Sequence, residues 1–113
     1  MSRRVPYDAD DLSLHEYRDI TKESSTIVYY TAKWCKPCQS IKPLYYRLKE
    51  TAPPSVRFIT IDIDRQGDIH DYEGLTSVPV FLFYQNGVKV DSLAKADPVE
   101  LENKFLKFVA MEM

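Results

Sequence analysis

A run of β-branched and aromatic residues leads into a helical pattern, and this junction constrains the fold more than any other feature of the sequence. Residues 26–31 read Thr-Ile-Val-Tyr-Tyr-Thr, a composition typical of a strand. The run lacks alternation, which favours a strand covered on both faces. Soon after it, Ile41, Leu44, Tyr45 and Leu48 recur at helical spacing and form one apolar stripe. A buried strand followed by an amphipathic helix indicates an α/β fold.

The rest of the chain supplies the other elements of such a fold. Its patterns predict a first helix over residues 10–20, strands over 56–62, 78–84 and 88–93, and a short helix over 67–72. Asn86 and Gly87 predict a two-residue type I′ turn between the last two strands, because both tolerate positive φ angles. Asp97, Pro98 and Glu100 predict the start of a last helix, with Asp97 as the N-cap and Glu100 completing a capping box.

Length and composition are those of one globular domain. The 113 residues are 44% hydrophobic and 28% charged, so we expect a single domain over residues 1–113 with its core at about 12–108. We expect a mixed β-sheet of four to five strands flanked by about four helices. A net charge of −2 gives no reason to expect nucleic acid or an anionic membrane as partner. No apolar run is long enough for a signal sequence or a membrane span, so we expect a cytoplasmic protein. We also expect a monomer.

Only two cysteines occur, Cys35 and Cys38, and they are three positions apart. A secreted scaffold usually has more cysteines at wider spacing. So close a pair closes too small a loop to stabilise the fold by restricting the unfolded chain. The other structural interpretation is that the two cysteines are half of a zinc site, which needs four ligands. The only histidines, His15 and His70, do not have the spacing from the cysteines that is typical of a zinc finger. We expect no metal, and the cysteine pair is predicted to be chemical rather than structural.

The position of the pair at a strand-to-helix junction predicts its chemistry. Cys35 is expected in the first helical turn, where free backbone N–H groups and the positive end of the helix dipole stabilise a thiolate. Lys33 and Lys36 add positive charge nearby, and Pro37 restrains the turn between the cysteines. Cys35 would attack a substrate disulfide to form a mixed disulfide, and Cys38, deeper under the surface, would then attack Cys35 and release the reduced substrate.

Four sequence features together resemble the thioredoxin family. They are the segment 30–38 (Tyr-Thr-Ala-Lys-Trp-Cys-Lys-Pro-Cys), Pro43 inside the following helix, the Val78-Pro79 pair and the Asn86-Gly87 turn. The resemblance covers about residues 12–108 and implies a thioredoxin fold. It also implies that Val78 and a cis Pro79 face the cysteines across a groove. There, Trp34 would form one wall, and the backbone of Val78 would pair with an extended substrate.

Three positions depart from the family pattern. Lys36 stands where most thioredoxins have glycine, and a lysine beside the thiolate would stabilise the reduced form and make the pair more oxidising. Tyr29 and Thr60 stand where the family has a buried aspartate and its lysine partner. The proton acceptor for Cys38 is therefore open, with water, Tyr29 or a substrate group as the candidates.

The resemblance implies a dithiol reductase of protein disulfides. With three glycines and no G-x-G-x-x-G motif, no flavin or nicotinamide cofactor is expected, so a thioredoxin reductase or an equivalent donor would supply electrons. Two alternatives stay open. Lys36 and the missing acid would suit a more oxidising thiol oxidase or isomerase, while the eight tyrosines could supply the contact surface of an interaction module with inert cysteines.

Overall fold

A computed structural model describes residues 12–112, and a four-stranded mixed sheet with four helices forms within them. The elements in chain order are α1 (Leu14–Glu23), β1 (Ser25–Thr31), α2 (Lys36–Thr51), β2 (Val56–Asp62), α3 (Gly67–Tyr72), β3 (Val80–Gln85), β4 (Val88–Leu93) and α4 (Pro98–Ala110). The strand order is β2-β1-β3-β4. Strand β1 runs parallel to β2 and antiparallel to β3, and β3 pairs antiparallel with β4. This arrangement confirms the predicted α/β fold and mixed sheet.

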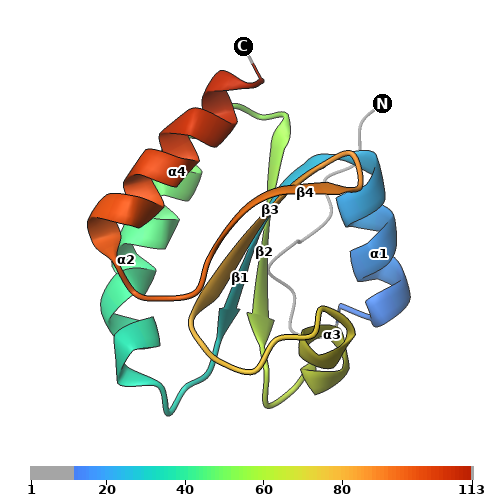
Figure 1. Cartoon of the computed structure of the whole chain (residues 1–113), viewed down its shortest axis with the longest axis vertical. Coiled ribbons are helices and arrows are strands. Elements are labelled where there is room, and N and C mark those ends of the chain that lie inside the picture. The colour runs from blue at the N-terminus through green and yellow to red at the C-terminus, as the bar shows by residue number, and fades with distance from the viewer. Residues whose placement is uncertain (1–11, 113) are drawn as a thin grey trace.

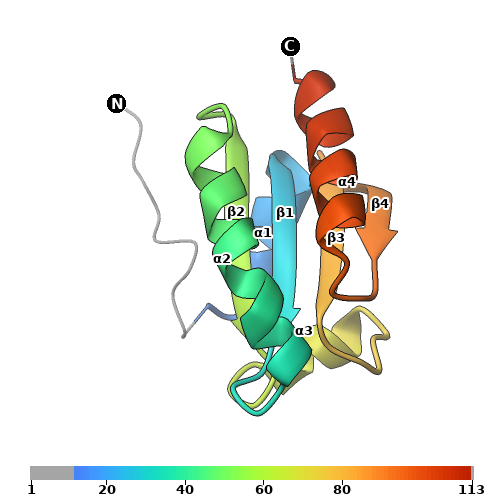
Figure 2. The ribbon, with the colours of Figure 1, turned by 90° about the vertical axis from the view of Figure 1, so that its left-hand side faces the viewer.

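The sheet is covered by helices on both faces (Figure 1). Helices α2 and α4 lie on one face, and α1 and α3 lie on the other, as the turned view also shows (Figure 2). All seven residues of β1 are buried, which confirms that this strand is covered on both sides. Its side chains alternate, so Tyr29 packs with the cluster under α2 and α4, while Tyr30 packs with the cluster under α1 and α3. Among residues 12–112, no helix is long and apolar enough to cross a membrane.

Helix α1 begins later than its sequence pattern suggests. The prediction began at Asp10, which lies outside the described residues. In the structure Ser13 is the N-cap: its hydroxyl accepts from the amide of Glu16 at 3.1 Å, and the Glu16 carboxylate accepts from the amide of Ser13 at 2.9 Å. This Ser-x-x-Glu capping box satisfies two free amides at once, which fixes the start of the helix.

Two further predicted signals are found where the sequence places them. Asp97 caps α4 by accepting from the amides of Val99 and Glu100. The predicted capping box is not formed among residues 12–112, because the Glu100 carboxylate forms an ion pair with Lys95 at 2.9 Å instead of accepting from the amide of Asp97. The residues of the β3–β4 turn, Asn86 and Gly87, have positive φ angles of 49° and 91°, as a type I′ turn requires.

The start of β3 differs from the prediction. The strand begins at Val80 rather than Val78, and Val80 is paired with Tyr30 of β1. Pro79 has no N–H to donate to a strand ladder, which explains why the paired region begins one residue after it. Val78 and Pro79 therefore form a loop at the end of the sheet, before β3.

Candidate active site

The two cysteines lie where β1 passes into α2, and they form a disulfide with a Cα–Cα distance of 5.2 Å. Cys35 is the N-cap of α2, one position before the first helical turn in which the sequence placed it. Its Sγ accepts a hydrogen bond from the backbone amide of Cys38 at 3.1 Å. The same amide would favour a thiolate on Cys35 after reduction, because it is one of the free N–H groups at the positive end of the helix.

The two sulfurs differ in access. Cys35 is 5% exposed and Cys38 is fully buried, which agrees with the prediction that Cys38 lies deeper. A substrate arriving from solvent can therefore reach Cys35, whereas Cys38 can reach only its neighbour. The arrangement suits one attacking and one resolving thiol.

The residues predicted to tune the redox chemistry of the pair are its neighbours in the sequence, and their side chains lie in solvent. Lys33, Lys36 and Pro37 are all exposed. Lys36 and Pro37 are the first two residues of α2, where proline is tolerated because its missing N–H would have no partner within the helix. The two ammonium groups act on the dithiol through water, which screens their charge.

The Val78–Pro79 loop faces the cysteines. Its peptide bond is cis, and the side chain of Val78 packs against the buried cluster of Ala32, Cys35 and Cys38. Ile63, which belongs to none of the sequence motifs, packs against the same cluster. Ile63 follows β2 as Ala32 follows β1, and parallel neighbouring strands end at the same edge of a sheet. That rule could have identified Ile63.

Trp34 lies on the surface next to Cys35, with 65% of the residue exposed. Its indole Nε1–H donates to a carboxylate oxygen of Asp64 at 3.0 Å. Asp64 also follows β2, so it too reaches the site through the pairing of parallel strands. This bond holds a large apolar ring at the rim of the site, where a docking polypeptide could cover it.

Tyr29 contacts the backbone of the site rather than its sulfur. Its hydroxyl donates to the carbonyl oxygen of Cys38 at 2.7 Å, and its ring stacks on Phe81 with centroids 4.9 Å apart. Burial raises the pKa of Tyr29, so the phenol stays protonated at neutral pH. Tyr29 is therefore not a proton acceptor for Cys38, which leaves water or a substrate group.

Thr60 pairs with Tyr29 across the β1–β2 ladder. The hydroxyls of Thr60 and Thr31 are buried. Both residues border a polar hollow of about 150 Å³, together with Lys42 and Asp62.

Replacing Tyr29 with phenylalanine is expected to cost stability but not catalysis. Losing the bond to the Cys38 carbonyl should lower the free energy of unfolding by about 1 kcal/mol. The turnover of a protein disulfide at pH 7 should change less than about twofold, because the phenol holds its proton throughout the reaction. Denaturant unfolding and steady-state turnover measure the two effects. A fall in turnover of tenfold or more would instead make Tyr29 the proton acceptor.

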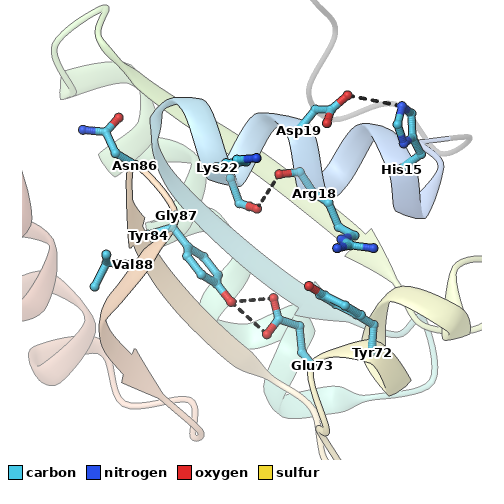
Figure 3. Close-up of a pocket in the computed structure, with 11 residues that line it drawn as sticks. His15, Arg18, Asp19, Lys22, Tyr72, Glu73, Tyr84, Asn86, Gly87 and Val88 are labelled. Carbon is cyan, nitrogen blue, oxygen red and sulfur yellow. Dashed lines mark hydrogen bonds and ion pairs between the residues drawn. The ribbon is translucent and has the colours of Figure 1, made fainter.

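A second hollow, of about 690 Å³, lies between α1, the end of α3 and the β3–β4 turn (Figure 3). None of the predicted site residues borders it. One residue that borders it is Glu73, whose carboxylate accepts from the hydroxyls of Tyr17 and Tyr84 and pairs with Lys89 at 3.5 Å. Glu73 thus connects the end of α3 to α1 and to both strands of the hairpin, a structural role that the sequence pattern did not reveal.

Metal ligands are not gathered in the described structure: within residues 12–112, no three His, Cys, Asp or Glu side chains lie close enough together to hold an ion. The site consists of a disulfide at a helix N-terminus, a loop that faces it and an exposed indole beside it. Its chemistry is that of the sulfurs.

Comparison with known proteins gives a consistent result. The sequence model of the family described as Thioredoxin matches residues 11–108. A thioredoxin from Malassezia sympodialis is 33% identical over 92 residues, covering 80% of this chain and 88% of that protein. Thioredoxin 1 from Plasmodium falciparum is 35% identical over 91 residues, covering 80% and 86%. Among solved structures, thioredoxin from Trypanosoma brucei brucei superposes with a TM-score of 0.80 at 28% identity and covers 97% of each chain.

Proposed function

The chain belongs to the thioredoxin family and is a thiol–disulfide oxidoreductase, and we propose that Cys35 and Cys38 are the catalytic pair with which it reduces protein disulfides. The observation that carries the proposal is the Cys35–Cys38 disulfide at the start of α2, with the Cys38 amide donating to the sulfur of Cys35. We also propose that residues 1–113 form a single domain with its core at about 12–108.

In the first step the Cys35 thiolate attacks one sulfur of a substrate disulfide. A bond forms between the sulfur of Cys35 and that sulfur, the substrate S–S bond breaks, and the leaving thiolate takes a proton. The helix N-terminus favours the attacking anion, since the Cys38 amide hydrogen-bonds to the Cys35 sulfur. The leaving group departs on the exposed side, because Cys38 is fully buried behind Cys35.

In the second step Cys38 resolves the mixed disulfide. Its thiol loses a proton to water or to the departing substrate, and the resulting thiolate attacks the sulfur of Cys35. The Cys35–substrate bond breaks, and the substrate leaves as a dithiol. The product is the Cys35–Cys38 disulfide, the form that the structure shows.

Substrate recognition would use the two features that flank the pair. We assign Val78 and Pro79 to one side of the groove, where the backbone of Val78 would pair with an extended segment of the substrate. Trp34, held by Asp64, would cover the other side. These contacts select a polypeptide over a small disulfide. A polypeptide has a backbone strand that can pair with Val78 and a broad surface that can cover Trp34, whereas a small disulfide has neither.

The oxidised pair must be reduced again for turnover. We propose a thioredoxin reductase or an equivalent dithiol donor as the electron source, and action as a monomer in a reducing compartment such as the cytoplasm. Only Cys35 of the pair has any exposed surface, so the donor would dock on the same face as the substrate.

In the experiment, a thioredoxin reductase with NADPH keeps the chain reduced, and a second protein with an accessible disulfide serves as the substrate. The expected result is catalytic NADPH consumption that depends on both the chain and the substrate. Failure of the pre-reduced protein to reduce the substrate even stoichiometrically would contradict the proposal and favour a binding role for the groove.

Removing the charge of Lys36 is expected to have a small effect on the redox potential. A lysine beside the thiolate stabilises the reduced pair, so Lys36→Gln should lower the midpoint potential. Because Lys36 is exposed, the shift should be about 20 mV or less. Equilibration in dithiol buffers measures it, with Lys107→Gln near the end of α4 as the matched control. A shift well above this limit would revive the more oxidising interpretation of the pair.

A further inference from the structure

We propose that His70 is a positioning residue for substrate binding: it orients the Ser77–Val78 peptide unit so that the amide of Val78 is presented to the substrate. The proposal rests on the proposed function, since it concerns how the groove beside Cys35 holds an extended chain. It adds a residue from α3 that neither the sequence motifs nor the dithiol geometry identifies.

The contact that carries the inference joins α3 to the loop before β3. His70 is in the last turn of α3, and the residue is only 8% exposed. Its Nε2 lies 3.0 Å from the carbonyl oxygen of Ser77. A carbonyl oxygen can only accept a hydrogen bond, so Nε2 carries the hydrogen and donates. A buried donor thus fixes the direction of one carbonyl in the loop.

The direction of that carbonyl determines the direction of the next amide. Among residues 12–112, the only cis peptide bond is Val78–Pro79, so the Ser77–Val78 bond is trans. In a trans peptide unit the C=O and the N–H lie in one plane and point in opposite directions. Since the carbonyl of Ser77 points to His70 on α3, the N–H of Val78 points away from α3.

The amide so oriented is available and close to the chemistry. The side chain of Val78 packs against the cluster of Ala32, Cys35 and Cys38, so this peptide unit lies next to the dithiol. The N–H of Val78 donates to no residue within 12–112. A free backbone donor beside the disulfide suits the carbonyl of an extended substrate, as in the addition of a strand.

The imidazole itself is held in place. Its ring contacts Tyr30 of the central strand, with centroids 5.7 Å apart. Tyr30 donates to the hydroxyl of Tyr17 at 2.7 Å, and Tyr17 donates in turn to the carboxylate of Glu73. Glu73 is the residue that follows α3, and Figure 3 shows it with Tyr84. The carbonyl of His70 also accepts from the amide of Leu75 at 3.2 Å. The loop that carries Val78 is thus connected through His70 to the centre of the sheet.

A simpler interpretation treats His70 as a buried side chain that only stabilises the fold. The two interpretations differ in which substrates are affected. A structural loss would slow all reactions of the dithiol alike, whereas a misoriented Val78 amide would weaken only substrates that pair with the backbone.

The experiment compares two substrates on three proteins. One substrate is an extended peptide with an internal disulfide, and the other is 5,5′-dithiobis(2-nitrobenzoate), which has no peptide backbone. In His70→Leu the donor is lost, and in His70→Gln the side-chain amide can replace it. His15→Leu is the control, because its side chain is 86% exposed on α1.

For His70→Leu we expect the KM for the peptide to rise about tenfold, because a tenfold loss of affinity corresponds to the loss of about one hydrogen bond. The kcat should change less than about twofold. The rate with the small disulfide and the midpoint potential of the dithiol should match those of the unmodified protein. His70→Gln should bring the KM back to within about threefold, and His15→Leu should behave like the unmodified protein. Thermal unfolding shows whether each variant is folded. If His70→Leu is not folded, the peptide KM of His70→Gln decides whether a donor at position 70 positions the substrate.

Three outcomes would overturn the proposal. If the unmodified protein reduces neither substrate, the proposed function fails and the role of His70 fails with it. If the unmodified protein reduces both but His70→Leu lowers both rates in parallel, His70 acts on structure alone. If His70→Leu leaves the peptide KM unchanged, or His70→Gln is as impaired as His70→Leu, the hydrogen bond does not position the substrate amide.

Discussion

Replacing Cys35 with serine is expected to reduce the turnover of a protein disulfide by about a thousandfold or more, because the reaction begins on that sulfur. A serine hydroxyl does not ionise near neutral pH, even with the Cys38 amide beside it, and oxygen cannot form the mixed disulfide. The assay is NADPH consumption with a reductase and a protein substrate. The folded state should survive, since the residue at 35 is a helix N-cap, a position that serine fills well.

Replacing Cys38 with serine should stop the same reaction at a different stage. Cys35 can still attack, but nothing resolves the mixed disulfide, so one equivalent of substrate should remain covalently bound. Mass spectrometry of the intact protein without reductant measures the adduct. An adduct on Cys35→Ser instead would reverse the roles of the two sulfurs, and full turnover by either variant would remove the dithiol from the mechanism.

Replacing Glu73 with leucine is expected to destabilise the fold by about 3 kcal/mol or more. The Glu73 side chain is only 6% exposed and accepts from the hydroxyls of Tyr17 and Tyr84. Hydrogen bonds to a charged group contribute about 1.5 to 3 kcal/mol each, and leucine would leave the hydroxyls of Tyr17 and Tyr84 without the acceptor to which they donate. Lys89 would lose its ion pair as well. Denaturant unfolding measures the difference in free energy.

Two variants make that test specific. Glu73→Gln keeps an acceptor oxygen and should lose about half as much stability as Glu73→Leu. Glu102→Leu removes an exposed carboxylate of α4 and should change the free energy of unfolding by less than about 0.5 kcal/mol. If Glu73→Leu proved as stable as Glu102→Leu, the cluster around Glu73 would not contribute to the fold.

Local patterns in the sequence predict most of the fold. The apolar run in β1, the Asn86-Gly87 turn and the cap at Asp97 each depend on a few neighbouring residues, and the structure confirms all three. The boundary of α1 was wrong by several residues, because two aspartates before the helix compete as caps with the Ser13-x-x-Glu16 box. Choosing between adjacent caps needs the geometry of the backbone, which the residue types alone do not give.

The dithiol was predictable, but its surroundings were not. Cys35 and Cys38 meet through local helix geometry, and Val78 was placed near them by the family resemblance alone. Trp34 reaches Asp64 across 30 positions, and Tyr17 reaches Glu73 across 56. Such contacts depend on the strand order, which brings distant segments to the same edge of the sheet. The sequence offers no periodicity from which these pairs could be identified.

The measurement that tests the central claim most directly is the redox equilibrium of Cys35 and Cys38. The protein is equilibrated in graded dithiol and disulfide buffers, and its oxidised fraction is determined by alkylation and mass. We expect one reversible two-electron transition at a low potential, near that of a thioredoxin at about −270 mV, with both cysteines changing together. A transition at a much higher potential would indicate an oxidase or isomerase, and the absence of any reversible couple would contradict the redox function altogether.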